Sequence, residues 1–219
     1  VIACGTAYHA GMVAKYAIEK WAKIPVDVEI ASEFRYRDPI IDPSTLIIAI
    51  SQSGETMDTL MAVRHAKAAG GRVLAICNTN SSTIPRESDA VLYTHAGPEI
   101  AVASTKALLT QIIAVYLIGL HLGQVNGSLK DTEVRDLYKE LLELPGKIEQ
   151  ILETVEPLRE LTRTFAENNT VLFLGRNIGY PVALEGALKL KELAYIHAEG
   201  FAGGELKHGP IALIDQGTP

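Results

Sequence analysis

Short apolar segments that alternate with helix-like segments constrain the fold of this chain more than any other feature. The clearest is the β-branched run Leu46–Ile50, which is typical of a buried parallel strand. We expect strands at 1–4, 26–30, 46–50, 72–77 and 90–94, a short helix near 31–34, and longer helices over about 8–22, after residue 56, and over about 106–122. Strands and helices that alternate at this spacing predict an α/β fold with a doubly wound parallel sheet.

The hexapeptide SQSGET, residues 51–56, follows the central strand and precedes a helix. The free N–H groups of a first helical turn, together with the helix dipole, form a site for an anion. Gly54 lets the backbone come close, and Ser51, Ser53 and Thr56 each offer a hydroxyl. The segment contains no Lys or Arg, which suits a phosphomonoester on a small metabolite. The alternative is a simple helix N-cap, since Ser and Thr are the usual capping residues; the spacing matches neither a Walker loop nor a hydrolase nucleophile elbow.

Two further small, hydroxyl-rich loops follow strands of the expected sheet. They are Cys4-Gly5-Thr6 and Val102-Ala103-Ser104-Thr105. Ligands of such sheets bind beyond the carboxyl ends of the strands, where these loops and SQSGET would meet. The three loops together favour a pocket for a sugar phosphate over a simple cap. Cys4 has no local basic partner, so we interpret it as a small residue near the ligand and not as a nucleophile.

The second part of the chain repeats the beginning of the first. Gly119–Ser128 is a glycine-rich break, and 131–166 is predicted to be helical with interruptions near Pro145-Gly146 and Pro157. A strand at 171–175, a loop and a helix from about Pro181 then match the strand, glycine loop and helix of 1–22, which indicates an internal duplication. We therefore expect a first domain at 1–125, a helical connector at 126–168 and an incomplete second domain at 169–219.

The helix expected from Pro181 to Tyr195 carries Glu185, Lys189 and Glu192 at i, i+4 and i+7, on one face. Most of the remaining circumference is apolar. An exposed salt-bridge ladder is one interpretation, and a charged strip that lines a cavity is the other. Downstream, His208 is either a helix-terminal residue or an acid–base group that titrates near neutrality, and the sequence leaves both open.

Composition excludes several classes of protein. A formal charge of −6 and a pI near 5.5 argue against nucleic acid as the main partner. No run approaches the ~20 apolar residues that we expect of a membrane span, and no Cys/His cluster has the spacing of metal ligands. Two cysteines fit a reducing, cytoplasmic environment. The chain begins at Val1 inside an apolar segment and ends at Pro219 just after another, so we expect it to be a piece of a longer protein.

Six motifs together resemble one known family. They are ACGT (3–6), SEFRYR (32–37), SQSGET (51–56), AVAST (101–105), LEGALKLKE (184–192) and GELKHGP (204–210). This set is similar to the sugar-isomerase part of the glutamine–fructose-6-phosphate aminotransferases, the glucosamine-6-phosphate synthases. SQSGET alone marks any phosphosugar-binding SIS domain, whereas LEGALKLKE with ELKHGP is more specific. The resemblance covers nearly the whole chain.

The resemblance implies two SIS domains of flavodoxin-like type, the second truncated, no cofactor, and conversion of fructose 6-phosphate to glucosamine 6-phosphate. It assigns substrate binding to Cys4, Gly5, Thr6, Ser51, Gln52, Ser53, Thr56, Val102 and Ser104. Glu192 would move a proton between C1 and C2, Lys189 would stabilise the developing enolamine oxygen, and His208 would assist ring opening. In this family the counterpart of His208 reaches into the pocket of the other subunit, so the resemblance implies a homodimer. Ala7 stands where many relatives have Ser, so one hydroxyl contact is lost.

The resemblance also implies that two parts of the family lie outside this chain. They are the glutaminase domain with its amino-terminal Cys and the tail with the Lys that forms a Schiff base with the sugar. We therefore expect this segment not to be a complete synthase. A phosphosugar-sensing module and a simple aldose–ketose phosphate isomerase are the alternative functions.

Overall fold

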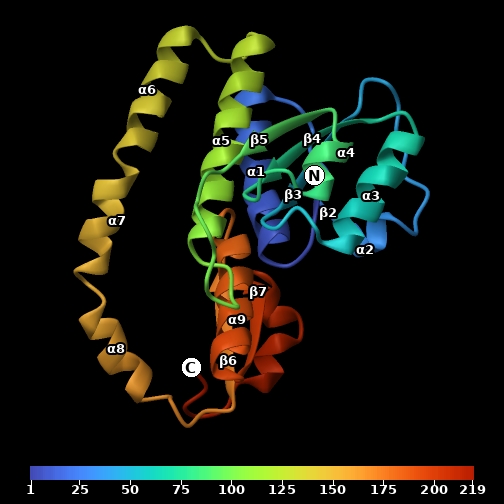
Figure 1. The fold of residues 1–219 in the computed structure, drawn as a ribbon. Helices are drawn as coiled ribbons and strands as arrows, with labels where there is room; N and C mark the ends of the chain where they lie inside the picture. The colour runs from blue at the N-terminus through green and yellow to red at the C-terminus, as the bar shows by residue number, and fades with distance from the viewer. The chain divides into compact units, whose positions relative to one another are not determined.

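The computed structural model describes all residues from 1 to 219, in two compact units that we describe separately (Figure 1). The first unit is Val1–Ser128 and the second is Leu129–Pro219. The segment expected to be a separate connector at 126–168 belongs mostly to the second unit.

The first unit contains a five-stranded parallel sheet. Its strands are β1 (Ile2–Ala3), β2 (Glu29–Ile30), β3 (Leu46–Ser51), β4 (Arg72–Cys77) and β5 (Ala90–Tyr93). Their order is β2-β1-β3-β4-β5, and every neighbouring pair is parallel. This is the flavodoxin-like order, in which the chain reverses its direction of winding between β1 and β3. The predicted fold class is confirmed.

Helices cover both faces of this sheet, as Figure 1 shows. The helices are α1 (Thr6–Ala22), α2 (Ala31–Phe34), α3 (Met57–Ala68), α4 (Thr83–Glu87) and α5 (Lys106–Val125). Side chains of a strand alternate between faces. Ile47 and Ala49 therefore pack into the core beneath α2, α3 and α4, while Ile48 and Ile50 pack into the core beneath α1 and α5. Residue 51 falls on the same face as α3.

The structure differs from the expected elements mainly at the edge of the sheet. The strands expected at 1–4 and 26–30 shorten to two residues each, because β2 is an edge strand that pairs with β1 only at Glu29 and Ile30. The helix α4 was not predicted; it lies between the strands expected at 72–77 and 90–94, where we expected no further element. Five residues are too few to show a helical apolar period.

Helix α5 corrects the statement that no segment matches a membrane span. It has 20 residues, and its length and hydropathy alone would allow it to cross a bilayer. In this structure its residues Ala114, Val115 and Ile118 pack into the core shared with α1. A core helix of a domain passes the same test of composition, and 39% of the apolar window of α5 is buried inside this structure.

The second unit begins with three helices and ends in a two-stranded parallel sheet. Its elements are α6 (Asp131–Leu142), α7 (Leu144–Leu152), α8 (Glu156–Arg163), β6 (Thr170–Gly175), α9 (Gly179–Ala194), β7 (His197–Ala202) and two short 3₁₀ helices, η1 (Glu205–His208) and η2 (Pro210–Leu213). The helical stretch is interrupted near Pro145 and Pro157 as expected, and each proline stands in the first turn of the helix that follows, α7 or α8. No residue of α6, α7 or α8 is buried.

Strand β7 was not predicted, and its sequence HAEGFA explains why. It pairs with β6 along six residues, from Thr170↔His197 to Gly175↔Ala202. A Cβ on Gly200 would lie 2.9 Å from the backbone of Leu184 in α9. The strand therefore needs a small residue where it passes beneath the helix, and this removes the apolar pattern of a strand. The succession β6-α9-β7 repeats β1-α1-β2, with the two strands adjacent and parallel in each case.

Candidate functional site

A small cavity lies at the carboxyl ends of β1 and β3, where the winding of the sheet reverses. Its volume is about 160 Å³. The residues that line it are Cys4, Thr6, Ala7, Ile50, Ser51, Gln52, Ser53, Thr56, Thr59, Ser104 and Gln111. The three loops expected to meet here do so, since each contributes to this lining. Sheets of this kind bind their ligands at such a reversal point.

Hydroxyl groups on the SQSGET loop form a linked set on one wall of the cavity. The Oγ of Ser51 and the Oγ1 of Thr56 lie 3.2 Å apart and share a hydrogen bond. The backbone N–H of Gly54 donates to Ser51 Oγ at 3.0 Å, and that of Glu55 donates to Ser53 Oγ at 3.2 Å. Ser51 is buried. The hydroxyls are thus held in place before any ligand arrives.

Helix α4 and the residue before it, Ser82, hold the SQSGET loop in place on the side away from the cavity. The carbonyl oxygen of Gly54 accepts from the N–H of Ile84 at 2.9 Å. Glu55 accepts from both the N–H and the hydroxyl of Thr83, at 2.7 and 3.0 Å, and so caps the start of α4. These bonds, first the one from the hydroxyl, lower the pKa of the Glu55 carboxyl. A Cβ on Gly54 would lie 2.0 Å from Ser82 Oγ, and its φ is +67°. The glycine therefore permits close packing on this segment, whereas we had expected it to allow a close approach of the ligand.

No side chain forms a capping hydrogen bond at the amino terminus of α3. Thr56 is the N-cap residue, but its hydroxyl bonds to Ser51, and no side chain caps the first amides of α3. No Lys or Arg lines the cavity. The one acidic residue of the first turn, Asp58, is paired with Arg35 at 3.0 Å. An anion in the cavity would be met by hydroxyls, amides and the helix dipole of roughly half a charge.

A carboxylate holds the third loop against α5. Glu99 accepts from the N–H of Thr105 at 3.1 Å, from its hydroxyl at 2.9 Å, and from the N–H of Ala107 at 3.2 Å. These bonds, of which the one from the Thr105 amide is the strongest, lower the pKa of the Glu99 carboxyl. The clamp brings Ser104 to the cavity, where its buried Oγ has no hydrogen-bond partner in the protein.

Two of the nine predicted binding residues do not line the cavity. Gly5 is exposed and begins α1 with φ +56°. The Val102 side chain is fully exposed. Their part in binding stays a prediction. The other seven, from Cys4 to Ser104, do line the cavity.

Two lining residues were missed, Thr59 on α3 and Gln111 on α5. Both are almost fully buried, and the Thr59 hydroxyl lies 4.0 Å from Cys4 Sγ. Gln111 was detectable as an amide inside a helix that is otherwise mostly apolar. Its Oε1 is buried and has no partner in the protein.

The predicted acid–base residues all lie in the second unit. On α9, Lys189 Nζ lies 2.6 Å from Glu192 Oε2 and 3.4 Å from Glu185 Oε1. The Glu185 side chain is only 8% exposed, whereas that of Glu192 is 36% exposed. The lysine thus links a buried carboxylate to an accessible one. His208 lies in η1 and is exposed.

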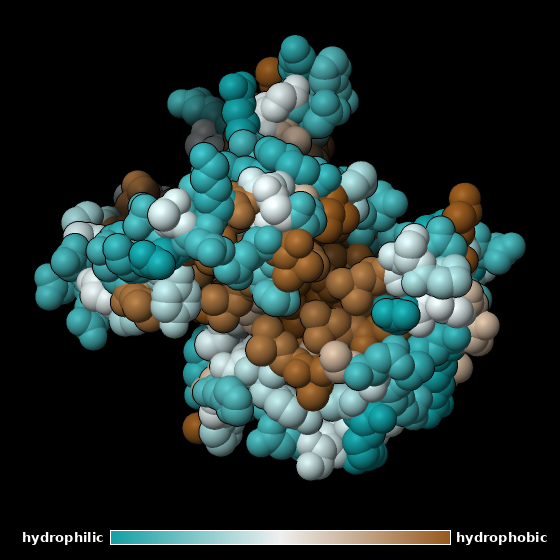
Figure 2. All heavy atoms as spheres, turned by 90° about the horizontal axis from the view of Figure 1, so that it is seen from above, coloured by the Kyte–Doolittle hydropathy of each residue, from teal (hydrophilic) through white to brown (hydrophobic).

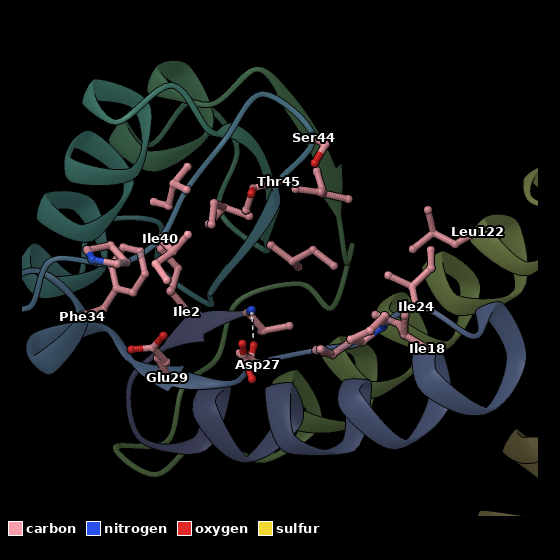
Figure 3. A pocket seen from close by; sticks show the side chains of 18 of the residues that line it. Ile2, Ile18, Ile24, Asp27, Glu29, Phe34, Ile40, Ser44, Thr45 and Leu122 are labelled. Atoms are coloured by element: carbon pink, nitrogen blue, oxygen red, sulfur yellow. Dashed lines mark hydrogen bonds between the residues drawn. The ribbon is translucent and has the colours of Figure 1, made fainter.

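A larger cavity of about 480 Å³ lies at the opposite, amino-terminal ends of the strands (Figure 3). Ile2, Ile18, Ile24 and other apolar side chains form most of its wall, and Figure 2 shows apolar side chains gathered in a hollow on one face of the molecule. Its polar side includes Asp27, Glu29 and Arg37, and the guanidinium of Arg37 is paired with the Glu29 carboxylate. The charged groups of this cavity are thus of both signs, whereas hydroxyls and amides line the smaller one.

A parallel sheet in flavodoxin-like order, with a hydroxyl-lined cavity at its reversal point, defines an α/β domain of the ligand-binding, doubly wound class. The sequence model of the SIS domain family matches residues 1–120 and 164–219, so the chain belongs to the SIS domain family. The unmatched stretch, residues 121–163, contains the three helices α6, α7 and α8.

Among known proteins the chain is similar to glutamine–fructose-6-phosphate aminotransferases [isomerizing]. That of Streptomyces coelicolor is 69% identical over all 219 residues, and that of Mycobacterium tuberculosis is 66% identical. The chain spans only 36% and 35% of the lengths of these two proteins, and it matches their SIS portion. The C-terminal domain of glucosamine-fructose-6-phosphate aminotransferase from Francisella tularensis superposes with a TM-score of 0.97 at 46% identity, over 100% of this chain and 61% of that one.

Proposed function

We propose that this chain is the sugar-isomerase part of a glutamine–fructose-6-phosphate aminotransferase and binds a hexose 6-phosphate at the SQSGET loop. The observation that carries the proposal is the hydroxyl-lined cavity in front of the uncapped amino terminus of α3. Hydroxyls and helix amides without a cation suit the phosphate of a monoester. The names of the relatives supply the substrate class, fructose 6-phosphate and its amino-sugar product.

The chemistry we propose is transfer of a proton between C1 and C2 of the open-chain sugar. Glu192 would act as the base, because its carboxylate is accessible and bonded to Lys189. Lys189 would stabilise the negative charge that develops on the sugar oxygen, and Glu185 would hold the lysine from its buried side. His208 would assist ring opening. Amino transfer from glutamine would be an activity of the full-length protein.

We also propose that the protein is a cytoplasmic homodimer. Both cysteines are free, which fits a reducing compartment. Helix α5 presents Leu109 and Val125, both substantially exposed, which a second copy could cover. Light scattering tests this, since a particle of 23.6 kDa at high concentration would contradict the dimer.

The binding proposal is tested with Thr56→Val, which removes one hydroxyl while keeping the shape of the side chain. Thr56 is preferable to Ser51, because Ser51 Oγ also accepts from Gly54 and its loss would disturb the loop. Loss of a hydrogen bond to a charged group should weaken binding of glucosamine 6-phosphate roughly 10- to 100-fold by calorimetry. Binding of glucosamine itself, which lacks the phosphate, should not change.

Thr132→Val is the matched control, since Thr132 is an exposed threonine in the first turn of α6. It should bind both sugars as the unsubstituted chain does. Equal losses of both sugars with Thr56→Val would place the phosphate elsewhere.

A further inference from the structure

The Oε1 of Gln111 is the one buried side-chain atom on α5 that has no hydrogen-bond partner, and Gln111 lines the cavity. Gln111 is 2% exposed and lies in the first two turns of α5. Its Oε1 accepts no hydrogen bond from the protein, and the same is true of the Oγ of Ser104, which lines the same cavity. Buried polar atoms are nearly always paired, so two orphans in one cavity need an explanation.

A structural role for the glutamine does not explain this arrangement. Its neighbours on the buried side of α5 are Ala107, Ala114 and Val115, which are apolar. An apolar residue at position 111 would pack against these residues without leaving an acceptor buried and unpaired. Such an unpaired acceptor costs free energy of folding, and folded proteins normally avoid it. The position of Gln111 in the wall of the cavity points instead to a partner that arrives with the ligand.

We propose that Gln111 is a specificity-determining residue whose Oε1 accepts a hydrogen bond from a hydroxyl or amino group of the bound sugar. This inference rests on the proposed function, since it takes the ligand to be a hexose 6-phosphate. The SQSGET loop supplies the hydroxyls and amides for the phosphate at the α3 side of the cavity. Gln111 enters from α5, a different element, and carries an acceptor that a phosphate dianion cannot satisfy.

The carboxamide oxygen of Gln111 determines which ligands are favoured. A carboxamide oxygen pairs only with a donor, so a sugar with O–H or N–H at the matching carbon satisfies it. A deoxy sugar or one with a carbonyl group at that carbon leaves it buried and unpaired. Ser104, whose hydroxyl both donates and accepts, can complete the contact from the neighbouring loop. The cavity would then select a hydroxylated sugar and not merely any phosphate.

The test is Gln111→Met, which keeps an unbranched side chain of similar length and removes the amide. Glucosamine 6-phosphate, glucose 6-phosphate, its 2-, 3- and 4-deoxy analogues, and inorganic phosphate are titrated by calorimetry. Binding of the hydroxylated sugars should weaken roughly 10- to 100-fold, the range for an unpaired buried group. Inorganic phosphate should bind as before. At least one deoxy analogue should bind the variant and the unsubstituted chain equally, because it lacks the donor.

Gln124→Met is the matched control, since Gln124 stands on the same helix but is exposed. It should leave every affinity unchanged. Thermal unfolding supplies a second readout, and Gln111→Leu is a second variant for it. If Oε1 is an orphan in the free protein, replacement by Met or Leu should leave the midpoint unchanged or raise it.

Each other outcome overturns the inference. Unchanged sugar affinities in Gln111→Met would refute the role of Gln111 while leaving phosphate binding intact. Parallel loss of inorganic phosphate, or a clear drop in the unfolding midpoint of both variants, would assign Gln111 a structural role. If the unsubstituted chain binds no hexose 6-phosphate, the proposed function fails, and this inference fails with it.

Discussion

Gly54→Ala is the substitution whose effect the structure defines most sharply. A Cβ at this position would lie 2.0 Å from Ser82 Oγ and 2.8 Å from Ser82 Cβ. The backbone φ of +67° adds strain, since a left-handed conformation costs an L-residue roughly 1–2 kcal/mol. Forced overpacking adds about 1–3 kcal/mol. We therefore expect the free energy of unfolding to fall by about 2–5 kcal/mol, the sum of these two ranges.

The two contributions can be separated with Ser82→Gly, which removes the two atoms closest to the added Cβ. Alone, this change should cost about 1–2 kcal/mol, because Ser82 Oγ donates to the carbonyl of Thr79 at 2.8 Å and glycine loosens the backbone. In the double variant the two severe contacts are gone, and the backbone strain remains together with a milder contact of 3.2 Å to Pro85 Cδ. The coupling energy of the double-mutant cycle should thus be about 1–3 kcal/mol in the stabilising direction.

Urea unfolding monitored by Trp21 fluorescence is the assay. Trp21 is the single tryptophan of the chain and packs edge-on against Tyr116 of α5 at 5.4 Å, so its signal reports on the first unit alone. Strict additivity of the two substitutions would refute the steric argument. A loss below about 0.5 kcal/mol for Gly54→Ala would refute the backbone argument as well.

Three further predictions concern titratable groups. Burial raises the pKa of the Cys77 thiol to about 12. Alkylation at pH 8, followed by mass spectrometry, should therefore modify Cys4 and spare Cys77. A hexose 6-phosphate should slow the labelling of Cys4, which lines the cavity. Because folding holds the Cys77 proton above the ordinary thiol pKa of about 9, the free energy of unfolding should decrease from pH 9 toward 12, and Cys77→Ala should flatten this profile. The lowered pKa of Glu99 means that its stabilisation is present above the ordinary carboxyl pKa and is lost as the pH falls through the lowered value. NMR titration should find that lowered pKa, and Glu99→Gln should reduce the loss of stability in acid while weakening sugar binding; the share that remains comes from other carboxyls such as Glu55. In the full-length protein, Glu192→Gln should abolish deuterium uptake at C2 of glucosamine 6-phosphate in heavy water. If Glu192→Gln keeps this exchange and Glu185→Gln loses it, the base is Glu185. Complete absence of exchange in the unsubstituted protein would favour a phosphosugar-sensing module.

Most of the architecture was predictable because it depends on local pattern. The run Leu46–Ile50 is apolar on both faces, as a central parallel strand must be when helices cover both sides. The position of SQSGET after this strand predicted its place at the edge of the sheet, since carboxyl ends of parallel strands share one edge. The duplication was visible for the same reason, because β6 and α9 repeat the local pattern of β1 and α1.

The elements that sequence reasoning missed depend on contacts between distant residues. Strand β7 lacks an apolar pattern because Gly200 must pass beneath Leu184, and α4 is a short helix capped by Glu55 from the SQSGET loop. We expected Gly54 of that loop to let a ligand approach the backbone, whereas the structure shows that it makes room for the side chain of Ser82.

The layers of the first unit, the loop that carries the hydroxyls and the family of the chain could thus be predicted from sequence, because each depends on residues that are neighbours along the chain. The side chains that complete the cavity could not be predicted in this way. Gln111 and Ser51 are 60 positions apart, and no local period relates them. They meet because α5 packs across the same sheet that ends at Ser51, and packing of that kind is a property of the folded chain as a whole.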